Sequence, residues 1–553
     1  MPNEVAITDS GAPGVTAERT SERSESRALD FLTLESAGAT FAYWAGVALI
    51  AIALFIPRLM PCVDYAQHVA LADIARRLTD PSAPEQVTHQ INYFTYNGLF
   101  HILVAKLGRV MPIEVAARSV VSLSMVVLAG AILALMRVLR RPPVYAALAT
   151  PVLFSFAVGW GFVNYALGTA LAFLTAVFVA RSLTKPTVTS LLLTALFGWL
   201  CALTHVLAML LLCVFAAALA PEVSYRSTRR IPHAILRTVI ALAPLLVGCL
   251  WCVAVYREQY AWNPVMYKDA TLEGTSPPVW QKLAFFGAWA TGVHSDFTDQ
   301  GLVAIAVIVL VVACVVGFRQ RFRQRDRDDA PLFVPFVAMF AAYLVTPMVF
   351  IGTHLIFPRL TQAVVIAAIL AAPRVTGVFS ARIRTAALTV AVLSGVNLVV
   401  HTSVYAAETN DASLVIDDLP PGRRVTAVVW GGDTFSFRHG TLVHYAAYYA
   451  ARKHGDWAFS FARYLSVPVR FRPGGGPAWP LKGWEFGAAD YNPRCKYARH
   501  FDLVIIKAPR LYDTERDVRD LVFGRDANAV KLASHHGHYW AFDTAGLPDD
   551  GTW

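Results

Sequence analysis

Long uncharged runs of apolar residues recur in this sequence between about residue 38 and residue 400, and they constrain its fold more than any other feature. A bilayer core is about 30 Å thick and offers no water to backbone amides, so a chain crosses it as an apolar helix of about 20 residues. Only 16% of the residues are charged, against about 25% in a typical soluble domain. The sequence therefore predicts an α-helical polytopic membrane protein.

The apolar runs predict about eleven crossings. Residues 188–220 are apolar over 33 positions, about 50 Å as a single helix, so we expect two crossings there with a turn near Thr204 and His205. The other crossings are expected over residues 38–56, 113–136, 144–160, 162–180, 238–255, 302–318, 332–350, 360–372 and 386–400. Residues 94–110 carry several charged or polar side chains and are short, so we expect an amphipathic helix on the outer membrane surface.

Clusters of lysine and arginine between the runs predict the orientation, because cytoplasmic loops are enriched in these residues. The strongest clusters lie at residues 137–141, 226–230, 319–327 and 374–384. All of them fall in the cytoplasm if the N-terminus does, which places residues 402–553 outside the cell. The net charge of +10 is spread over these clusters and not over one patch, so no nucleic-acid partner is expected. We expect the protein in a bacterial inner membrane, with residues 1–36 as a disordered cytosolic tail.

In this topology the polar residues of the apolar region gather in the outer loops. The first outer loop, residues 57–112, is long and contains Asp64 and His68. Because polar side chains at membrane depth usually face a cavity or a pathway, we expect a cavity that opens to the outer side. The later outer loops contain Asn164, His205, His354 and Arg359, and the loop over residues 256–301 contains Asp269, Glu273, His294, Asp296 and Asp299.

Asp64 is the most informative of these positions. It lies a few residues beyond the first crossing, and His68 follows one helical turn later. A carboxylate positioned at a membrane boundary can act as a general base. Aspartate is also preferred as the N-cap of a helix, and a contact to a ligand or substrate is a third interpretation. The residues alone leave these three roles open.

The composition changes after His401, and residues 402–553 alternate between strand and helix patterns. Strands are expected over residues 423–430 and 502–507, helices over 441–453 and 514–522, and a strand pair over 529–542 around Gly537. This alternation predicts a small α/β domain that either binds an acceptor or covers the cavity. His535, His536 and His538 are not expected to bind a metal, because adjacent residues of a strand point to opposite faces.

The layout resembles the GT-C superfamily of membrane glycosyltransferases, which includes protein mannosyltransferases, aminoarabinose transferases and oligosaccharyltransferases. Shared features are a first crossing, an acidic residue that opens a long outer loop with surface helices, many further crossings and often a soluble outer domain. The resemblance covers about residues 40–400. The matching segments are Pro61-Cys-Val-Asp-Tyr-Ala-Gln-His68, Tyr93-Phe-Thr-Tyr-Asn-Gly-Leu-Phe-His101, Pro112-Ile-Glu-Val-Ala-Ala-Arg118, Trp160-Gly-Phe-Val-Asn164 and Leu203-Thr-His205.

The resemblance implies transfer of a sugar from a polyprenyl-phosphate donor, taken from the membrane lipids, to an acceptor glycan, lipid or protein. It implies that Asp64 accepts the proton of the attacking hydroxyl. The candidate substrate-binding residues are His68, Arg118, Asn164, His205, His354 and Arg359. The chain departs from the family because no second acid adjoins Asp64 and because Phe94-Thr-Tyr-Asn-Gly98 replaces Pro-Pro-Leu-Tyr. No cofactor is therefore expected, and the sequence gives a divalent metal no support.

Two other functions stay open: a non-catalytic assembly subunit with the same architecture, and a transporter or flippase of envelope lipids.

Arg359 also has three expected fates, namely snorkelling to lipid headgroups, pairing with an outer-loop acid such as Asp296, or binding the donor phosphate. Snorkelling is the commonest of the three, whereas the geometry of a guanidinium suits bidentate contact with phosphate.

Overall fold

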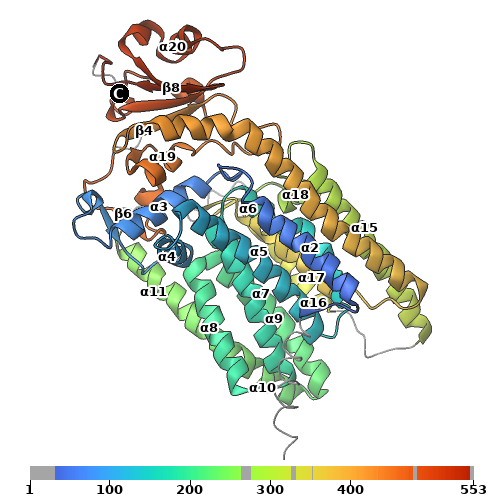
Figure 1. Cartoon of the computed structure of the whole chain (residues 1–553). Coiled ribbons are helices and arrows are strands. Elements are labelled where there is room, and N and C mark those ends of the chain that lie inside the picture. The colour runs from blue at the N-terminus through green and yellow to red at the C-terminus, as the bar shows by residue number, and fades with distance from the viewer. Residues whose placement is uncertain are drawn as a thin grey trace, which may run out of the picture.

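The computed structural model describes residues 32–262, 276–324, 332–350, 353–432, 434–477 and 483–548. A helical bundle carries a small mixed sheet at one end, built by the C-terminal residues (Figure 1). Within the described residues, six helices are long and apolar enough to cross a membrane, and six shorter apolar helices accompany them. This confirms the predicted polytopic helical fold with a small C-terminal α/β domain. Asp269, Glu273 and residues 1–31 lie outside the described residues.

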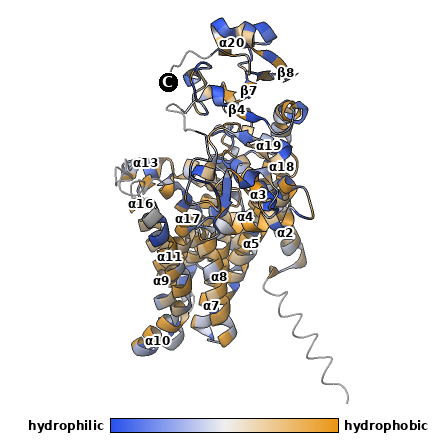
Figure 2. Cartoon of the chain, turned by 90° about the vertical axis from the view of Figure 1, so that its left-hand side faces the viewer, coloured by the Kyte–Doolittle hydropathy of each residue, from blue (hydrophilic) through white to orange (hydrophobic). Residues whose placement is uncertain are grey.

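The apolar helices follow the predicted crossings closely, and Figure 2 shows hydrophobic residues concentrated in the bundle. The longer helices are α5 (Ile113–Val138), α7 (Val163–Thr184), α9 (Val206–Thr228), α10 (Ile231–Leu242) continued by α11 (Leu246–Trp262), α15 (Thr298–Gln324) and α18 (Val378–Asp418). The shorter ones include α2 (Ala37–Ala53), α4 (Gly98–Leu107), α8 (Val188–Thr204), α16 (Phe333–Val345) and α17 (Ile356–Ala371). With ten residues, α4 is about 15 Å long and too short to cross a bilayer.

The turn predicted inside residues 188–220 is confirmed at His205. This residue is extended, with φ −167° and ψ 129°, and it separates α8 from α9. The His205 side chain caps the N-terminus of α9, since its Nδ1 accepts the backbone N–H of Leu207 at 3.1 Å. Gly168 of α7 makes room for the turn, because a Cβ there would lie 2.5 Å from the hydroxyl oxygen of Thr204.

The third predicted crossing, residues 144–160, is not a regular helix. A 3₁₀ segment (Pro143–Val152) is followed by a single α-turn, α6 (Phe156–Gly159). Pro151 lies inside the 3₁₀ segment and has no N–H to donate. The segment is buried within the bundle, and irregular backbone is tolerated at membrane depth where protein surrounds it. The apolar composition correctly placed this segment inside the bundle, but it did not predict the 3₁₀ conformation.

Two further boundaries differ from the prediction. The helix α16 ends at Val345, and a short hairpin of β2 (Val349–Phe350) and β3 (Thr353–His354) follows it. The last helix, α18, has 41 residues and is about 62 Å long, so the predicted domain boundary at residue 402 falls inside it. It packs along α2 over the bundle and reaches the C-terminal sheet, where its end contacts β8 (Figure 1).

The C-terminal sheet has five strands in the order β5-β4-β7-β9-β8. The parallel strands are β4 (Arg424–Val429), β5 (Asp456–Trp457) and β7 (Leu503–Lys507), and β8 (Lys531–His536) and β9 (Tyr539–Asp543) form the antiparallel edge. The helices α19 (Ala446–Lys453) and α20 (Glu515–Phe523) complete the predicted α/β pattern. The histidines of β8 diverge, since the His535 ring stacks on Trp540 while His536 pairs with Asp418 at 2.8 Å.

The C-terminal domain is attached directly to the loop that follows α2. In that loop, β1 (His89–Ile91) pairs antiparallel with β6 (Val469–Phe471) of the C-terminal domain. The helix α3 (Tyr65–Arg77) contributes the fully buried Gln67. The Gln67 amide oxygen accepts the indole N–H of Trp457 at 2.8 Å, and its amide nitrogen donates to the carbonyl of Phe459 at 3.0 Å. These contacts fix the domain over one end of the bundle.

Candidate functional site

A cavity of about 400 Å³ lies where the C-terminal domain meets the bundle. The beginnings of α3, α7, α9 and α17 meet there, and the C-terminal segment over residues 461–467 closes one side. Five of the seven predicted site residues line it, namely Asp64, His68, Asn164, His205 and Arg359. Arg118 and His354 are not part of the lining. The structure thus gathers in one space residues that are almost 300 positions apart in the sequence.

The Asp64 carboxylate lines one side of the cavity, and His444 and Glu485 lie behind it, outside the lining; we call these three residues the acidic wall. The imidazole of His444 lies between the two carboxylates, with Nε2 3.3 Å from Asp64 Oδ1 and Nδ1 3.2 Å from Glu485 Oε2. Burial opposes a charge on this ring, but Glu485 and Asp64 together raise the pKa of His444 to about 10. His444 is therefore a cation at neutral pH and forms an ion pair with Asp64.

The backbone around Asp64 is positioned by the start of the α7 region. The amides of Val63 and Asp64 donate to the carbonyls of Gly159 and Trp160 at 3.2 and 3.0 Å. Gly161 permits this contact, since its φ is +94° and a Cβ would lie 2.5 Å from the Asp64 nitrogen. Asp64 occupies the N-cap position of α3, yet its carboxylate makes no capping hydrogen bond. The capping role considered for Asp64 is therefore not what the structure shows.

His68 lies beside the acidic wall and is paired with a second histidine. His101 Nδ1 lies 2.8 Å from the carbonyl of Asn97, and its Nε2 lies 3.2 Å from His68 Nδ1. The carbonyl can only accept, so the hydrogens run along the chain and His68 keeps Nε2 as an acceptor. Burial and the neighbouring histidines lower the pKa of His68 well below its ordinary value. His68 is thus a neutral acceptor.

A second wall, which we call the basic wall, consists of Arg359, His205 and Phe162. The guanidinium carbon of Arg359 lies 3.5 Å from the centre of the Phe162 ring. Its nitrogens donate to the carbonyls of Leu355 and His354 at 3.1 and 2.9 Å. Within the described residues, no carboxylate forms an ion pair with Arg359. The basic wall therefore carries a buried positive charge, on which Asp64 acts from across the cavity without forming an ion pair.

The contact between His205 and Arg359 indicates where an anion would bind. His205 Nδ1 accepts the N–H of Leu207, so the hydrogen of the neutral ring is on Nε2. That nitrogen lies 3.2 Å from Arg359 Nη1, which is also a donor. Two donors at this distance repel, and an acceptor oxygen that faces both of them from the side relieves the repulsion. A phosphate oxygen that faces both would receive a charge-assisted hydrogen bond from Arg359 and a second bond from His205.

The position of Arg359 excludes snorkelling and an ion pair with Asp296. Its side chain is 5% exposed, so it does not snorkel to the surface. Asp296 pairs instead with His401 at 3.1 Å. Arg118 and His354, which were predicted to contact substrate, have other partners. The Arg118 guanidinium donates to the carbonyl of Arg58, and the backbone carbonyl of His354 accepts from Arg359.

Two asparagine side chains add unpaired acceptors to the lining. The side-chain oxygens of Asn97 and Asn164 are buried and have no hydrogen-bond partner within the described residues. An unsatisfied buried acceptor costs about 1–3 kcal/mol, which a ligand hydroxyl can recover. The polar part of the cavity therefore offers acceptors at Asn97, Asn164 and His68, and paired donors at the basic wall. This combination suits a molecule that bears both hydroxyl groups and a phosphate.

The other part of the lining is apolar and continues to the lipid-facing surface. Val206, Leu207 and Leu210 come from one side of α9, and Ile356 comes from the start of α17. Leu210 is 55% exposed, so this wall runs from the basic wall to the outside of the bundle. A hydrophobic chain attached to the bound anion can leave along it without entering water.

His444 and Glu485 could not be identified from the sequence. Both are far from Asp64 in the chain, and neither lies in a motif that the sequence shares with the GT-C superfamily. The sequence lacked a second acid beside Asp64, and the structure supplies one from the C-terminal domain through His444. The fully buried Gln67 also gave no signal, because a glutamine in an amphipathic helix is ordinarily exposed.

The architecture is similar to that of solved membrane proteins. The chain superposes on the crystal structure of ArnT from Cupriavidus metallidurans bound to undecaprenyl phosphate with a TM-score of 0.53 and 12% identity, covering 92% of this chain and 99% of that one. Superposition on the same protein in the apo state gives a TM-score of 0.50 and 12% identity, over 95% and 100% of the two chains. No protein-family model and no curated protein matches the sequence. These likenesses show that the chain shares the fold of ArnT, and they agree with the polytopic helical fold that the sequence predicts.

Proposed function

We propose that this protein is a membrane glycosyltransferase that moves a sugar from a polyprenyl-phosphate donor to an acceptor hydroxyl. The observation that carries the proposal is one cavity with a carboxylate on one wall, a paired phosphate donor set on the other, and an apolar path to the lipid. The similarity to an ArnT structure that contains undecaprenyl phosphate supports the lipid part of the donor.

In this mechanism Asp64 acts as the general base. Its Oδ1 is held by His444, and its second oxygen accepts the proton of the acceptor hydroxyl. The hydroxyl oxygen then bonds to the anomeric carbon while the bond from that carbon to the phosphate oxygen breaks. The electron pair leaves with the polyprenyl phosphate, whose growing negative charge is stabilised by Arg359 and His205.

Asn97, Asn164 and His68 hold the sugar or the acceptor through their free acceptor atoms. The tail of the lipid lies along Val206, Leu207 and Leu210. The C-terminal domain closes the site, because residues 461–467 line it and Gln67 fixes them to α3. Closure of this kind excludes water, which would otherwise compete with the acceptor.

Binding of undecaprenyl phosphate and the lipid content of cells test the proposal together. The purified full-length protein should bind undecaprenyl phosphate, and a strain that lacks the gene should accumulate a polyprenyl-linked sugar. Restoring the wild-type gene should remove the accumulated lipid, whereas Asp64→Asn should not, although it still binds undecaprenyl phosphate. If Asp64→Asn removes the lipid as well as the wild type does, a transporter or an assembly subunit explains the protein better.

We also propose that the cavity opens to the extracytoplasmic side, as the basic clusters predict. Single cysteines at Ser82 and Gly475, in a background without native cysteines, should react with a membrane-impermeant thiol reagent in intact spheroplasts. A cysteine at Asp328 should react only after lysis. Reaction at Asp328 alone in intact spheroplasts would reverse the orientation.

A further inference from the structure

A short stretch of the C-terminal domain, residues 434–440, is bound to the loop that precedes α15; we call it the anchor segment. Phe437 forms a β-bridge with His294 of the loop, and its side chain is fully buried. The Arg438 N–H donates to the carbonyl of Val293 at 2.8 Å. The anchor segment is therefore fixed to the loop by backbone contacts and by a buried aromatic ring.

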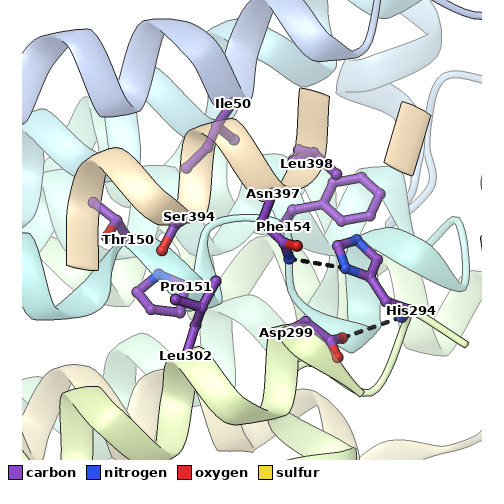
Figure 3. A pocket seen from close by; sticks show the side chains of 10 residues that line it. All are labelled: Ile50, Thr150, Pro151, Phe154, His294, Asp299, Leu302, Ser394, Asn397 and Leu398. Carbon is purple, nitrogen blue, oxygen red and sulfur yellow. Dashed lines mark hydrogen bonds between the residues drawn. The ribbon is translucent and has the colours of Figure 1, made fainter. Parts of the chain in front are cut away.

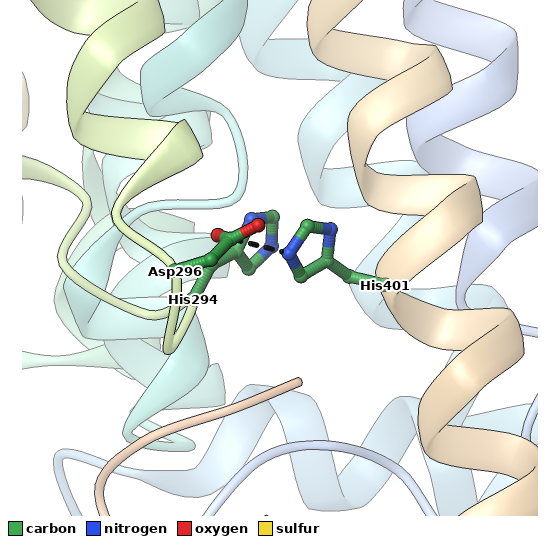
Figure 4. Close-up of side chains that lie close together, drawn as sticks. All are labelled: His294, Asp296 and His401. Atoms are coloured by element: carbon green, nitrogen blue, oxygen red, sulfur yellow. Dashed lines mark ion pairs between the residues drawn. The ribbon is translucent and has the colours of Figure 1, made fainter. Parts of the chain in front are cut away.

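The loop is in turn held on α18. The ring of His294 stacks on the ring of His401, with centroids 3.8 Å apart and planes 8° apart (Figure 4). The side-chain amide of Asn397 donates to His294 Nδ1 at 3.0 Å, and the Asp299 carboxylate accepts the His294 N–H at 3.2 Å (Figure 3). Asp299 also accepts the N–H of Val293 at 2.6 Å. Both the side chain and the backbone of the loop are bound, so the loop is a firm support for the anchor segment.

His439, near the end of the anchor segment, connects the loop to the turn that holds Asp64. Its Nε2 lies 2.6 Å from the carbonyl oxygen of Gly292, which can only accept, so the ring donates this hydrogen bond. The same ring lies against Trp160 and Phe156, with centroid distances of 5.6 and 5.3 Å. The backbone of His439 is left-handed, with φ +69°, a conformation that persists where surrounding contacts hold it.

The α6 turn lies between His439 and Asp64. The Trp160 carbonyl accepts the Asp64 N–H at 3.0 Å. Gly159 packs against Val293 of the loop, since a Cβ at Gly159 would lie 2.6 Å from a methyl carbon of Val293. The turn is thus supported on the side away from Asp64 by the loop and by the His439 ring, and a shift of the turn would carry Asp64 with it.

His439 also determines where the segment that carries His444 begins. His444 follows five residues later, and Leu442 between them is fully buried. His444 Nε2 lies 3.3 Å from Asp64 Oδ1. The two partners of this contact therefore both depend on His439, Asp64 through the Trp160 carbonyl and His444 through the chain.

We propose that His439 is a positioning residue that sets the geometry between Asp64 and His444. Its ring supports the turn whose carbonyl holds the Asp64 amide, and its hydrogen bond to Gly292 connects that turn and the anchor segment to the loop on α18. The effect on sugar transfer rests on the function proposed for Asp64, whereas the Asp64–His444 contact can be tested without a substrate.

Melting temperatures of the full-length protein between about pH 6.5 and about pH 10 test the contact. Burial lowers the pKa of His444, whereas Glu485 and Asp64 raise it to about 10, so stability is lost as the pH rises through this range. The decline should be smaller in His439→Asn than in the wild type and should approach that of Asp64→Asn. Asparagine tolerates a positive φ, so the backbone is retained. His454→Asn, the same change at φ +58° after α19, should decline as the wild type does.

Transfer rates provide a second readout, which a general loss of stability would not reproduce. The substrate is the polyprenyl-linked sugar that the deletion strain accumulates. A displacement of Asp64 by about 1 Å can cost about 10²-fold in rate, so His439→Asn should lower kcat by about that factor and leave binding of undecaprenyl phosphate unchanged. In an Asp64→Asn background the same change should have little further effect, because the base is already absent. Equal losses of rate in both backgrounds would reduce His439 to a role in stability and overturn the proposal.

His439→Gln covers the case in which the asparagine variant fails to fold. Its amide nitrogen is as many bonds from Cα as Nε2 and can donate to Gly292, but the ring against Trp160 is lost. Its decline with pH should also be smaller than that of the wild type. A decline as large as the wild type's, in whichever variant folds, would overturn the proposal. Absence of transfer by the wild type would instead contradict the proposed function and leave the pH test valid.

Discussion

The two walls of the cavity differ in whether their charged side chains form ion pairs within the protein. On the acidic wall, both carboxylates meet a protein cation, because His444 lies between Asp64 and Glu485. On the basic wall, Arg359 has aromatic and carbonyl neighbours and meets no carboxylate within the described residues. The carboxylates of the acidic wall thus have a positively charged partner in the protein. The arginine of the basic wall gains an ion-pair partner only when an anion binds.

The difference indicates how the two walls divide the proposed reaction. A carboxylate that His444 holds in place is positioned to accept a proton before any ligand arrives. An arginine without an ion-pair partner can bind a negatively charged ligand. It can also stabilise the additional negative charge that the ligand's phosphate gains when the bond to the sugar breaks. Changes to the acidic wall should therefore reduce turnover, and changes to the basic wall should reduce binding of the lipid phosphate.

The largest effect is expected for Asp64→Asn. The amide keeps the shape of the side chain and removes the basic oxygen, so kcat should fall by about 10²–10⁴-fold. Binding of undecaprenyl phosphate, measured by native mass spectrometry or by its effect on Tm, should change less than twofold. Asp80→Asn, an exposed change in the same loop, is the matched control. Equal losses of binding and turnover would mean that Asp64 belongs to the donor site.

Gly161→Ala should give the next largest effect. Its Cβ would meet the Asp64 amide at 2.5 Å, and the residue would keep a φ of +94° that only glycine adopts easily. A displacement of Asp64 by about 1 Å can cost about 10²-fold in rate. Gly377→Ala is the control, since its φ is +68° but a Cβ would find open space. Similar rates for the two variants would show that strain, and not displacement of Asp64, matters at Gly161.

Arg359→Lys separates the basic wall from the acidic wall. A lysine keeps the charge but loses the planar donor set, so undecaprenyl phosphate should bind about 10- to 100-fold more weakly, equivalent to one charge-assisted hydrogen bond. Arg118→Lys is the matched control, because Arg118 is equally buried but donates to the Arg58 carbonyl outside the cavity. Unchanged binding in Arg359→Lys would exclude a bidentate phosphate contact.

The smallest effect on rate, a loss of several-fold, is expected for His444→Gln. Its main effect should be on how the free energy of unfolding depends on pH. The pKa of His444 is raised from its ordinary 6.5 to about 10 in the folded protein. The folded state binds more protons between these values, so the free energy of unfolding should fall as pH rises from about 6.5 to about 10.

Melting temperatures measured across this pH range should show the decline in the wild type and less of it in His444→Gln. His536→Gln serves as the control, since His536 pairs with Asp418 at the end of α18, away from the cavity. A decline of the same size in the His444 variant would mean that this ring is not the group that titrates.

Hydropathy was sufficient to predict most of the helices. The apolar stretch at residues 188–220 predicted two helices with a break at His205, and the structure has that break. Apolarity could not distinguish a lipid-facing helix from a buried irregular segment, so residues 144–160 were predicted as a helix and are mostly 3₁₀. It also could not show that α18 continues to Asp418, because the second half of that helix is too polar to be predicted as a crossing.

The sequence by itself determined the polytopic helical fold and marked Asp64 and Arg359 as candidate site residues, because each follows from local composition and its place relative to a crossing. Only the tertiary structure decided what surrounds them. His444 reaches Asp64 from almost 400 residues away and contacts Glu485 with its other ring nitrogen, and His401 meets His294 across more than 100 residues. Side-chain contacts at such separations depend on how helices and domains pack, and no local pattern of residues records that packing.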